Sequence, residues 1–506
     1  MRKPLLALAA VALVTSACSG SAGSSTGYGP TAPPAHHQPP PPVYPDAPAS
    51  TPYDGVTYED PGVNPYVDPA EDRVSTFALD VDTASYTIAQ RYLDDGYRPD
   101  PASVRVEEWV NAFDQGYEPP LDDAFAIIAD GGPTPFTDRD EVLLRIGLQA
   151  REVRDRARQD ASLTFVIDTS GSMGRESRLE LVKDALARLV DGLDRRDTVA
   201  IVTFGDVGRV LLEPTPASER DAILDVIDRL QPGGSTNLED GLRLGYDLAR
   251  SALTENGIDR VVLASDGVAN VGLTDPQGIL ETIRRDAEAG IELVSVGVGM
   301  GNYNDVLLEQ LADQGDGFYA YVNGPEEAHR LFTEDLTGTL QTVALDARAQ
   351  VEFDREAVAA YRLVGYENRA VDDRDFTNDS VDAGAIGAGH SVTALYALRL
   401  TGDIGQGRLA TVRLRWTDPD TGRVDELVRE VTARHLARDF SSTDPFFRLD
   451  AVVASTAEVL RGSPWVGGLH LSDVADVAYR EAESLPPTDE VHSFLDLLDR
   501  LARMDE

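Results

Sequence analysis

The chain has 506 residues, which at roughly 100–200 residues per domain is enough for about two to four folded units. Apolar residues make up 42% and charged residues 26%, a composition that allows large cores and argues against disorder throughout. The formal net charge of −42 argues against binding to nucleic acid and against a polybasic membrane contact. A single cysteine, Cys18, excludes an intramolecular disulfide and a cysteine-built metal site.

The N-terminus has the features of an export signal. Arg2 and Lys3 precede an apolar run over residues 5–14, which is too short to span a bilayer. Small residues then lead directly to Cys18, and this pattern resembles a bacterial lipobox, although Thr15 stands where that pattern prefers leucine. The resemblance implies that Cys18 is lipidated and becomes the mature N-terminus, so that the protein is anchored on the extracytoplasmic side of the membrane. The alternative is an ordinary secretory signal with an incidental cysteine.

A proline-rich segment follows the signal. Residues 19–70 contain 13 of the 30 prolines, together with many small residues. This composition favours extended polyproline II geometry and cannot bury a core. We therefore expect a disordered tether between the anchor and the folded part of the chain.

The central segment has the pattern of a parallel α/β domain. Short continuous apolar runs, typical of strands buried on both faces, occupy residues 163–167, 199–204, 261–264 and 291–296. Amphipathic stretches that predict helices occupy residues 179–193, 222–230, 238–253 and 278–289. Alternating strands and helices predict a doubly wound sheet, in which ligands bind beyond the carboxyl ends of the strands.

Oxygen-bearing side chains follow three of these predicted elements. Asp168, Ser170 and Ser172 come directly after the first strand, Thr236 lies in a glycine loop that opens a helix, and Asp266 follows a later strand. These are two carboxylates and three hydroxyls, all hard oxygen donors that suit Mg²⁺, Mn²⁺ or Ca²⁺ better than zinc or copper. A glycine run at 297–301 also follows a strand, but its spacing is not that of a dinucleotide-binding loop.

The pattern Asp-x-Ser-x-Ser, then Thr, then Asp resembles the metal-ion-dependent adhesion site (MIDAS) of von Willebrand factor type A (VWFA) domains. The resemblance implies that Ser170, Ser172 and Thr236 bind the ion directly or nearly so. It implies that Asp168 and Asp266 act mainly through water or by hydrogen-bonding the hydroxyls. In that family a carboxylate from a protein partner fills the open position of the ion. Helix caps and tight turns are the alternative explanation of these residues.

The same residues favour binding over turnover. Ahead of residue 329 the only histidines are His36 and His37 in the predicted tether, so no general base is expected near the oxygen cluster. The leading hypothesis is a protein that captures a protein partner through a divalent ion and is not an enzyme. A metal-assisted hydrolase or phosphatase, and a structural envelope protein whose ion only stiffens the loops, remain the alternatives.

The flanks resemble those of a bacterial lipoprotein family with a VWFA domain, through residues 77–86 and 104–108 and through the C-terminal third. Apolar residues at alternate positions over 343–353 predict a half-buried strand. Further strands are predicted at residues 124–129, 142–148, 392–400, 409–416 and 424–431. We expect strands from both flanks to form one β-sandwich, with the α/β domain inserted into it, and three helices to follow over residues 445–504.

The expected organisation therefore has five parts. They are a lipoprotein signal peptide (1–18), a disordered tether (19–70), an N-terminal flanking domain that supplies part of the sandwich (71–160), a VWFA domain (161–340), and a C-terminal sandwich and helical domain (341–506).

Overall fold

The structure is a computed structural model of the whole chain. It describes residues 58, 60–79, 81–136, 141–153, 159–254, 257–267, 276–302, 305–325, 328, 331–332, 341–378, 384–402, 405 and 407–505. Cys18, His36 and His37 lie outside the described residues, and so do most of the predicted tether and the whole predicted signal peptide.

A six-stranded sheet forms the centre of the α/β unit, in the order β6-β5-β4-β7-β8-β9. Its strands are β4 (Ala161–Asp168), β5 (Thr198–Phe204), β6 (Arg209–Pro216), β7 (Ile258–Gly267), β8 (Ile291–Asn302) and β9 (Tyr319–Val322). All neighbours are parallel except β5 and β6. Every residue of β4 is buried, as expected for an apolar strand at the centre of a parallel sheet.

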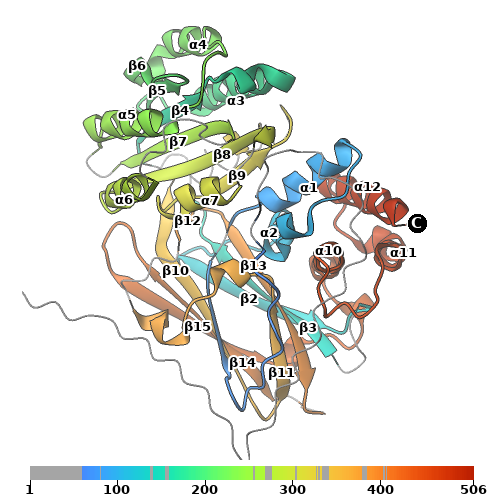
Figure 1. The fold of residues 1–506 in the computed structure, drawn as a ribbon. Coiled ribbons are helices and arrows are strands. Elements are labelled where there is room, and N and C mark those ends of the chain that lie inside the picture. Colours follow the sequence, from blue (N-terminus) through green and yellow to red (C-terminus); the bar gives the residue numbers. More distant parts are fainter. Residues whose placement is uncertain are drawn as a thin grey trace, which may run out of the picture. The chain divides into compact units, whose positions relative to one another are not determined.

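Helices cover both faces of this sheet (Figure 1). They are α3 (Arg178–Gly192), α4 (Arg220–Asp228), α5 (Leu238–Ser251), α6 (Pro276–Ala287) and α7 (Asp305–Asp313). The apolar sides of α3 and α4 pack on one face, in a cluster with Leu163 and Phe165 of β4. Those of α5, α6 and α7 pack on the other face, around Val166. The predicted doubly wound architecture is confirmed.

Strands from both flanks form a β-sandwich. One sheet has the order β1-β10-β14-β15, with β12 paired to β10, and the other has the order β11-β13-β3-β2. The strands before the α/β unit are β1 (Val74–Ala78), β2 (Phe125–Gly132) and β3 (Glu141–Ala150). Those after it are β10 (Thr342–Phe353), β11 (Val358–Val364), β12 (Ile386–Gly387), β13 (Ser391–Leu400), β14 (Arg408–Thr417) and β15 (Val424–Thr432). Because β3 pairs with β13 and β1 with β10, the predicted insertion of the α/β unit into a sandwich is confirmed.

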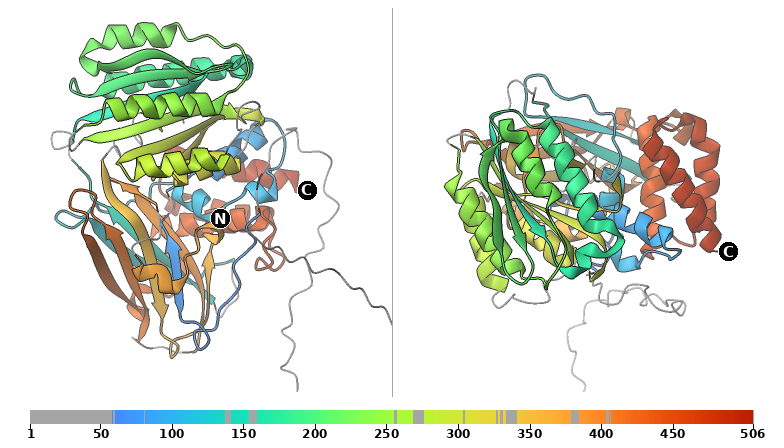
Figure 2. Two further views of the ribbon diagram at one scale, coloured as in Figure 1. Left: turned by 60° about the vertical axis from the view of Figure 1, so that its left-hand side comes forward. Right: turned by 90° about the horizontal axis from the view of Figure 1, so that it is seen from above.

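Three helices follow the sandwich, as predicted. They are α10 (Pro445–Leu460), α11 (Leu471–Glu481) and α12 (Asp489–Met504). They share one apolar cluster with the flanking helix α2 (Val106–Asn111), and α12 also contacts the flanking helix α1 (Ala84–Asp94). Figure 2 shows the three C-terminal helices side by side, next to α1 and α2. Among the described residues, none of the helices has both the length and the apolar character needed to cross a membrane.

A partly buried group of ion pairs joins the α/β unit to its flanks. Glu309 of α7 accepts from Arg105 over 2.9 Å and lies 3.5 Å from Arg369. Arg369 also pairs with Asp313 of α7 over 2.6 Å and with Asp82 over 3.0 Å. Because Arg105 and Asp82 precede the α/β unit and Arg369 follows it, these pairs fix α7 to both flanks.

The last residues of the predicted tether contact the sandwich. Val67 forms a two-way backbone bridge with Tyr361, and the hydroxyl of Tyr66 donates to Glu141 over 2.6 Å. The ring of Tyr66 also packs edge-on against Trp465 at 5.0 Å between ring centres. The structured part of the chain therefore begins several residues before position 71, because Tyr66 and Val67 supply side chains that can be buried.

Candidate metal centre

Asp168 ends β4 and is fully buried. Its Oδ1 accepts from the backbone N–H of Ser170 over 2.7 Å, and its Oδ2 accepts from the hydroxyl of Ser265 over 2.8 Å. The first bond closes the turn that follows β4, and the second joins β4 to the neighbouring strand β7. The carboxylate therefore fixes the turn that carries the two predicted serine ligands.

The two serine hydroxyls and the second carboxylate are joined by hydrogen bonds. The Oγ atoms of Ser170 and Ser172 lie 2.9 Å apart, and the hydroxyl of Ser172 donates to Oδ1 of Asp266 over 2.9 Å. Ser170 is 2% exposed and Asp266 is 3% exposed. The turn after β4 and the end of β7 thus bring four predicted site residues together.

Thr236 lies on an adjacent loop between α4 and α5. The N–H of Gly233 donates to the carbonyl of Thr169 over 2.7 Å, and the N–H of Gly171 donates to the carbonyl of Gly234 over 3.1 Å. These two bonds hold the loop against the turn that carries Ser170 and Ser172. Thr236 is 5% exposed, and Asn237 caps α5 through its side chain, which accepts from the N–H of Asp240. A helix cap is therefore present directly beside Thr236, at Asn237.

The electrostatics of this oxygen cluster suit a cation. Burial, together with the nearby negative charge of Asp266, raises the pKa of Asp168 to about 6, although hydrogen bonds from Ser170 and Ser265 act to lower it. A divalent ion would offset the cost of keeping both carboxylates charged. Two carboxylates and three hydroxyls are hard oxygen donors, a set that fits Mg²⁺, Mn²⁺ or Ca²⁺. Within the described residues, no group of three or more His, Cys, Asp or Glu side chains forms a metal cluster.

Two contacts of this cluster were not anticipated from the sequence. They are made by Ser265, whose hydroxyl donates to Asp168, and by Arg178. A guanidinium N–H of Arg178 donates to Oδ2 of Asp266 over 2.8 Å, and both side chains are about 95% buried. The glycine run at 297–301, which was expected to follow a strand, lies within β8, and Gly299 leaves the space that the side chain of Arg178 occupies.

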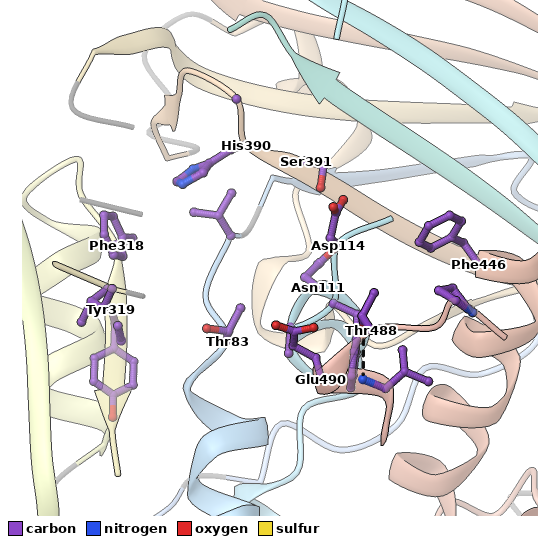
Figure 3. A pocket seen from close by; sticks show the side chains of 18 residues that line it. Thr83, Asn111, Asp114, Phe318, Tyr319, His390, Ser391, Phe446, Thr488 and Glu490 are labelled. Atoms are coloured by element: carbon purple, nitrogen blue, oxygen red, sulfur yellow. Dashed lines mark hydrogen bonds between the residues drawn. The ribbon is translucent and has the colours of Figure 1, made fainter. Parts of the chain in front are cut away.

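A separate cavity of about 470 Å³ lies where β9, the two flanks and the start of α12 meet. Figure 3 shows Phe318 and Tyr319 on one side of it, Thr488 and Glu490 on the other, and His390 near Phe318. Burial, together with the charge of Arg260, lowers the pKa of His390 to about 4, so the ring is neutral at pH 7. None of the predicted metal-site residues lines this cavity.

Three family models match the chain. The von Willebrand factor type A domain model matches residues 162–334, a model described as von Willebrand factor matches residues 53–145, and the C-terminal model of the uncharacterized protein YfbK matches residues 338–408. The first match covers the α/β unit with all five candidate ligands.

Known proteins resemble the chain over different lengths. The uncharacterized protein YfbK of Escherichia coli (strain K12) is 35% identical over 431 residues, which are 80% of this chain and 74% of that protein. Human inter-alpha-trypsin inhibitor heavy chain H3 is 32% identical over 215 residues, which are 41% of this chain and 22% of that protein. A solved structure, the von Willebrand factor type A protein from Catenulispora acidiphila, has 18% identity and a TM-score of 0.43, covering 73% of this chain and 89% of that one. The chain belongs to the YfbK family of proteins with a von Willebrand factor type A domain.

Proposed function

We propose that this protein binds a protein partner through a divalent ion held by Asp168, Ser170, Ser172, Thr236 and Asp266. The observation that carries the proposal is the convergence of three loops at one edge of the sheet. Ser172 joins two of them through its hydrogen bonds with Ser170 and Asp266, and backbone hydrogen bonds of Gly233 and Gly234 hold the loop of Thr236 against the first. Mg²⁺ suits this donor set, as do Mn²⁺ and Ca²⁺. When bound, the ion supplies an electrophilic position to which a carboxylate of the partner can bind.

Each of these residues has a distinct part in the proposal. The hydroxyls of Ser170, Ser172 and Thr236 are weak neutral donors, so they leave the ion with most of its positive charge. Asp168 orients the turn through Ser170, and Asp266 accepts from Ser172, so both carboxylates position the hydroxyls. This division supports binding of an anionic group, because a strongly charged ligand set would satisfy the ion by itself.

We further propose that Cys18 is lipidated and that cleavage directly before it makes Cys18 the mature N-terminus. The protein would then be anchored to the bacterial membrane and exposed on its extracytoplasmic side, with residues 19 to about 60 as the tether. The support is the position of the only cysteine, which follows an apolar run of export-signal length and three small residues. Metabolic labelling with a palmitate analogue, in the wild type and in Cys18→Ser, tests this part by itself.

The test of the ion site combines calorimetry with partner capture. The full chain is titrated with Mg²⁺, and envelope extract is passed over it in Mg²⁺, in chelator, and in Mg²⁺ restored after chelator. Ser170→Ala and Asp266→Ala are compared with Ser162→Ala, a buried serine at the other end of β4. We expect Mg²⁺ binding and capture to be lost in the first two variants and kept in the third.

Other outcomes would favour the alternatives. Capture that is unchanged in chelator and in both site variants would remove the ion from the interaction. If chelator lowers the melting temperature but leaves capture unchanged, the ion is structural. If the protein hydrolyses any of a panel of phosphoesters and Asp168→Asn abolishes that activity, the site is catalytic, as the hydrolase alternative predicts.

A further inference from the structure

The guanidinium of Arg178 lies inside the candidate metal centre. It donates to Oδ2 of Asp266 over 2.8 Å, while Oδ1 of the same carboxylate accepts from Ser172 over 2.9 Å. Arg178 is 5% exposed, so it is not a surface charge that solvent screens. One of the two carboxylates of the site therefore has a permanent positive partner within the protein.

The fold around Arg178 keeps it in this place. A Cβ atom added to Gly299 would lie 2.4 Å from Nε of Arg178, so the side chain crosses the surface of β8 where a glycine leaves room. The two preceding residues, Glu176 and Ser177, have positive φ angles of 50° and 57°, which non-glycine residues rarely adopt. This strained pair turns the chain so that α3 begins at Arg178, beside the end of β7.

A second contact ties this arrangement to the flank. The carboxylate of Glu176 lies 3.5 Å from Arg178 and accepts from Arg91 of α1 over 3.2 Å. Arg91, Glu176, Arg178 and Asp266 thus form a row of alternating charges from the flanking helix to the site. The guanidinium is held from both sides, and its position is part of the site's construction.

We propose that Arg178 is a positioning residue that opposes binding of the divalent ion alone and favours binding of the ion together with an anionic partner group. This inference rests on the proposed function. Summed over the whole site, the charges of Asp168 and Asp266 balance those of a divalent ion, so the guanidinium gives the site one positive charge in excess. One carboxylate from a partner cancels that charge. Because of the buried arginine, binding of the partner's carboxylate strengthens binding of the ion, and binding of the ion strengthens binding of the partner.

The experiment measures Mg²⁺ affinity by calorimetry in the full chain and in three variants. Arg178→Gln removes the charge, and Arg178→Lys keeps it. Arg188→Gln removes an exposed charge from the same helix, where Arg188 pairs with exposed Asp184, and is the matched control. Each titration is done in sodium chloride and in sodium acetate of equal ionic strength, with acetate as the carboxylate probe. If circular dichroism shows that Arg178→Gln does not fold, it is replaced by Arg178→Met, which is also uncharged and has a long apolar side chain.

In chloride we expect Arg178→Gln to bind Mg²⁺ about tenfold more tightly than the wild type, because a buried charge of the same sign as the ion has been removed. Acetate should strengthen Mg²⁺ binding in the wild type, Arg178→Lys and Arg188→Gln more than in Arg178→Gln. The inference would be overturned if Arg178→Gln bound Mg²⁺ no more tightly than the wild type. Arg178 would then only hold Asp266 in place. If neither the wild type nor Arg178→Gln binds Mg²⁺, the proposed function itself fails.

Discussion

Replacing His390 should change how the stability of the sandwich depends on pH. The pKa of His390 is lowered to about 4, mainly by burial, whereas an unfolded histidine has a pKa of about 6.5. A group whose pKa is depressed on folding contributes stability that is present above the unfolded value and is lost as the pH falls towards the folded value. The difference of about 2.5 units, at about 1.4 kcal/mol each, limits the effect to roughly 3 kcal/mol.

The loss of stability grows as the pH falls. As the pH falls, His390 takes up a proton more readily in the unfolded chain than in the folded one. The free energy of unfolding therefore falls by about 2 kcal/mol from pH 7 to pH 5, and by about 3 kcal/mol from pH 7 to pH 4. His390→Phe removes the titrating group and keeps a ring beside Phe318, whose centre lies 6.2 Å from that of the histidine ring. The variant should therefore lack this part of the pH dependence.

Denaturant unfolding followed by tryptophan fluorescence is the appropriate assay. The three tryptophans, Trp109, Trp416 and Trp465, all lie outside the α/β unit, so fluorescence reports the sandwich and helices beside His390. The quantity compared is the difference between the wild type and His390→Phe at each pH, which cancels the contributions of the other titrating groups. If that difference stays constant from pH 7 to about pH 4, the histidine is not held neutral by burial and the reasoning is wrong.

Two further predictions concern packing and buried charge. Gly299→Ala should destabilise the protein by about 1–3 kcal/mol more than Gly290→Ala in thermal unfolding, because both glycines have positive φ but only at Gly299 does the added Cβ meet Arg178. Equal losses in the two variants would contradict the close contact. Glu309→Ala should cost about 3–5 kcal/mol because it leaves buried arginines of the flanks without this partner, whereas Glu180→Ala, at an exposed pair, should cost less than about 1 kcal/mol. Similar values for these two variants would show that the ion pairs at α7 contribute little.

Most of the strands that were predicted from sequence are buried on both faces or regularly on one, although β15 was also predicted and has a single buried residue. β4, β5 and β7 begin and end within three residues of the apolar runs, and β10 follows the alternation at 343–353. β8 begins with its apolar run at Ile291 but continues to Asn302, through the glycine run that was expected to follow the strand. The strands that were not predicted are β6 and β9 of the α/β unit and β1, β11 and β12 of the sandwich. β6 is mostly exposed at the sheet edge, and its sequence includes Pro214 and Pro216, so it carries neither an apolar run nor clean alternation. β9 has only four residues.

The candidate site was predictable only where residues are close in sequence or match a known pattern. Asp168, Ser170 and Ser172 form one turn, and the strand and loop pattern suggested Thr236 and Asp266. The contacts of Arg178 and Ser265 with the two carboxylates join residues 88 and 97 positions apart. An arginine at the start of an amphipathic helix is usually exposed, so nothing local indicates that Arg178 is buried against Asp266.

The insertion of the α/β unit has a consequence for the order in which the protein folds. All strand partners of its sheet lie between residues 161 and 322, so this unit can complete its pairing as soon as that stretch is available. β3 instead cannot complete its pairing until β13 is available, because Ser391 of β13 pairs with Gln149 of β3. In the same way β1 needs β10. In a chain that emerges from its N-terminus, the paired β2 and β3 therefore keep an unprotected edge until the last third has emerged. Aggregation during biogenesis should begin at that edge, and truncation before β13 should expose it permanently.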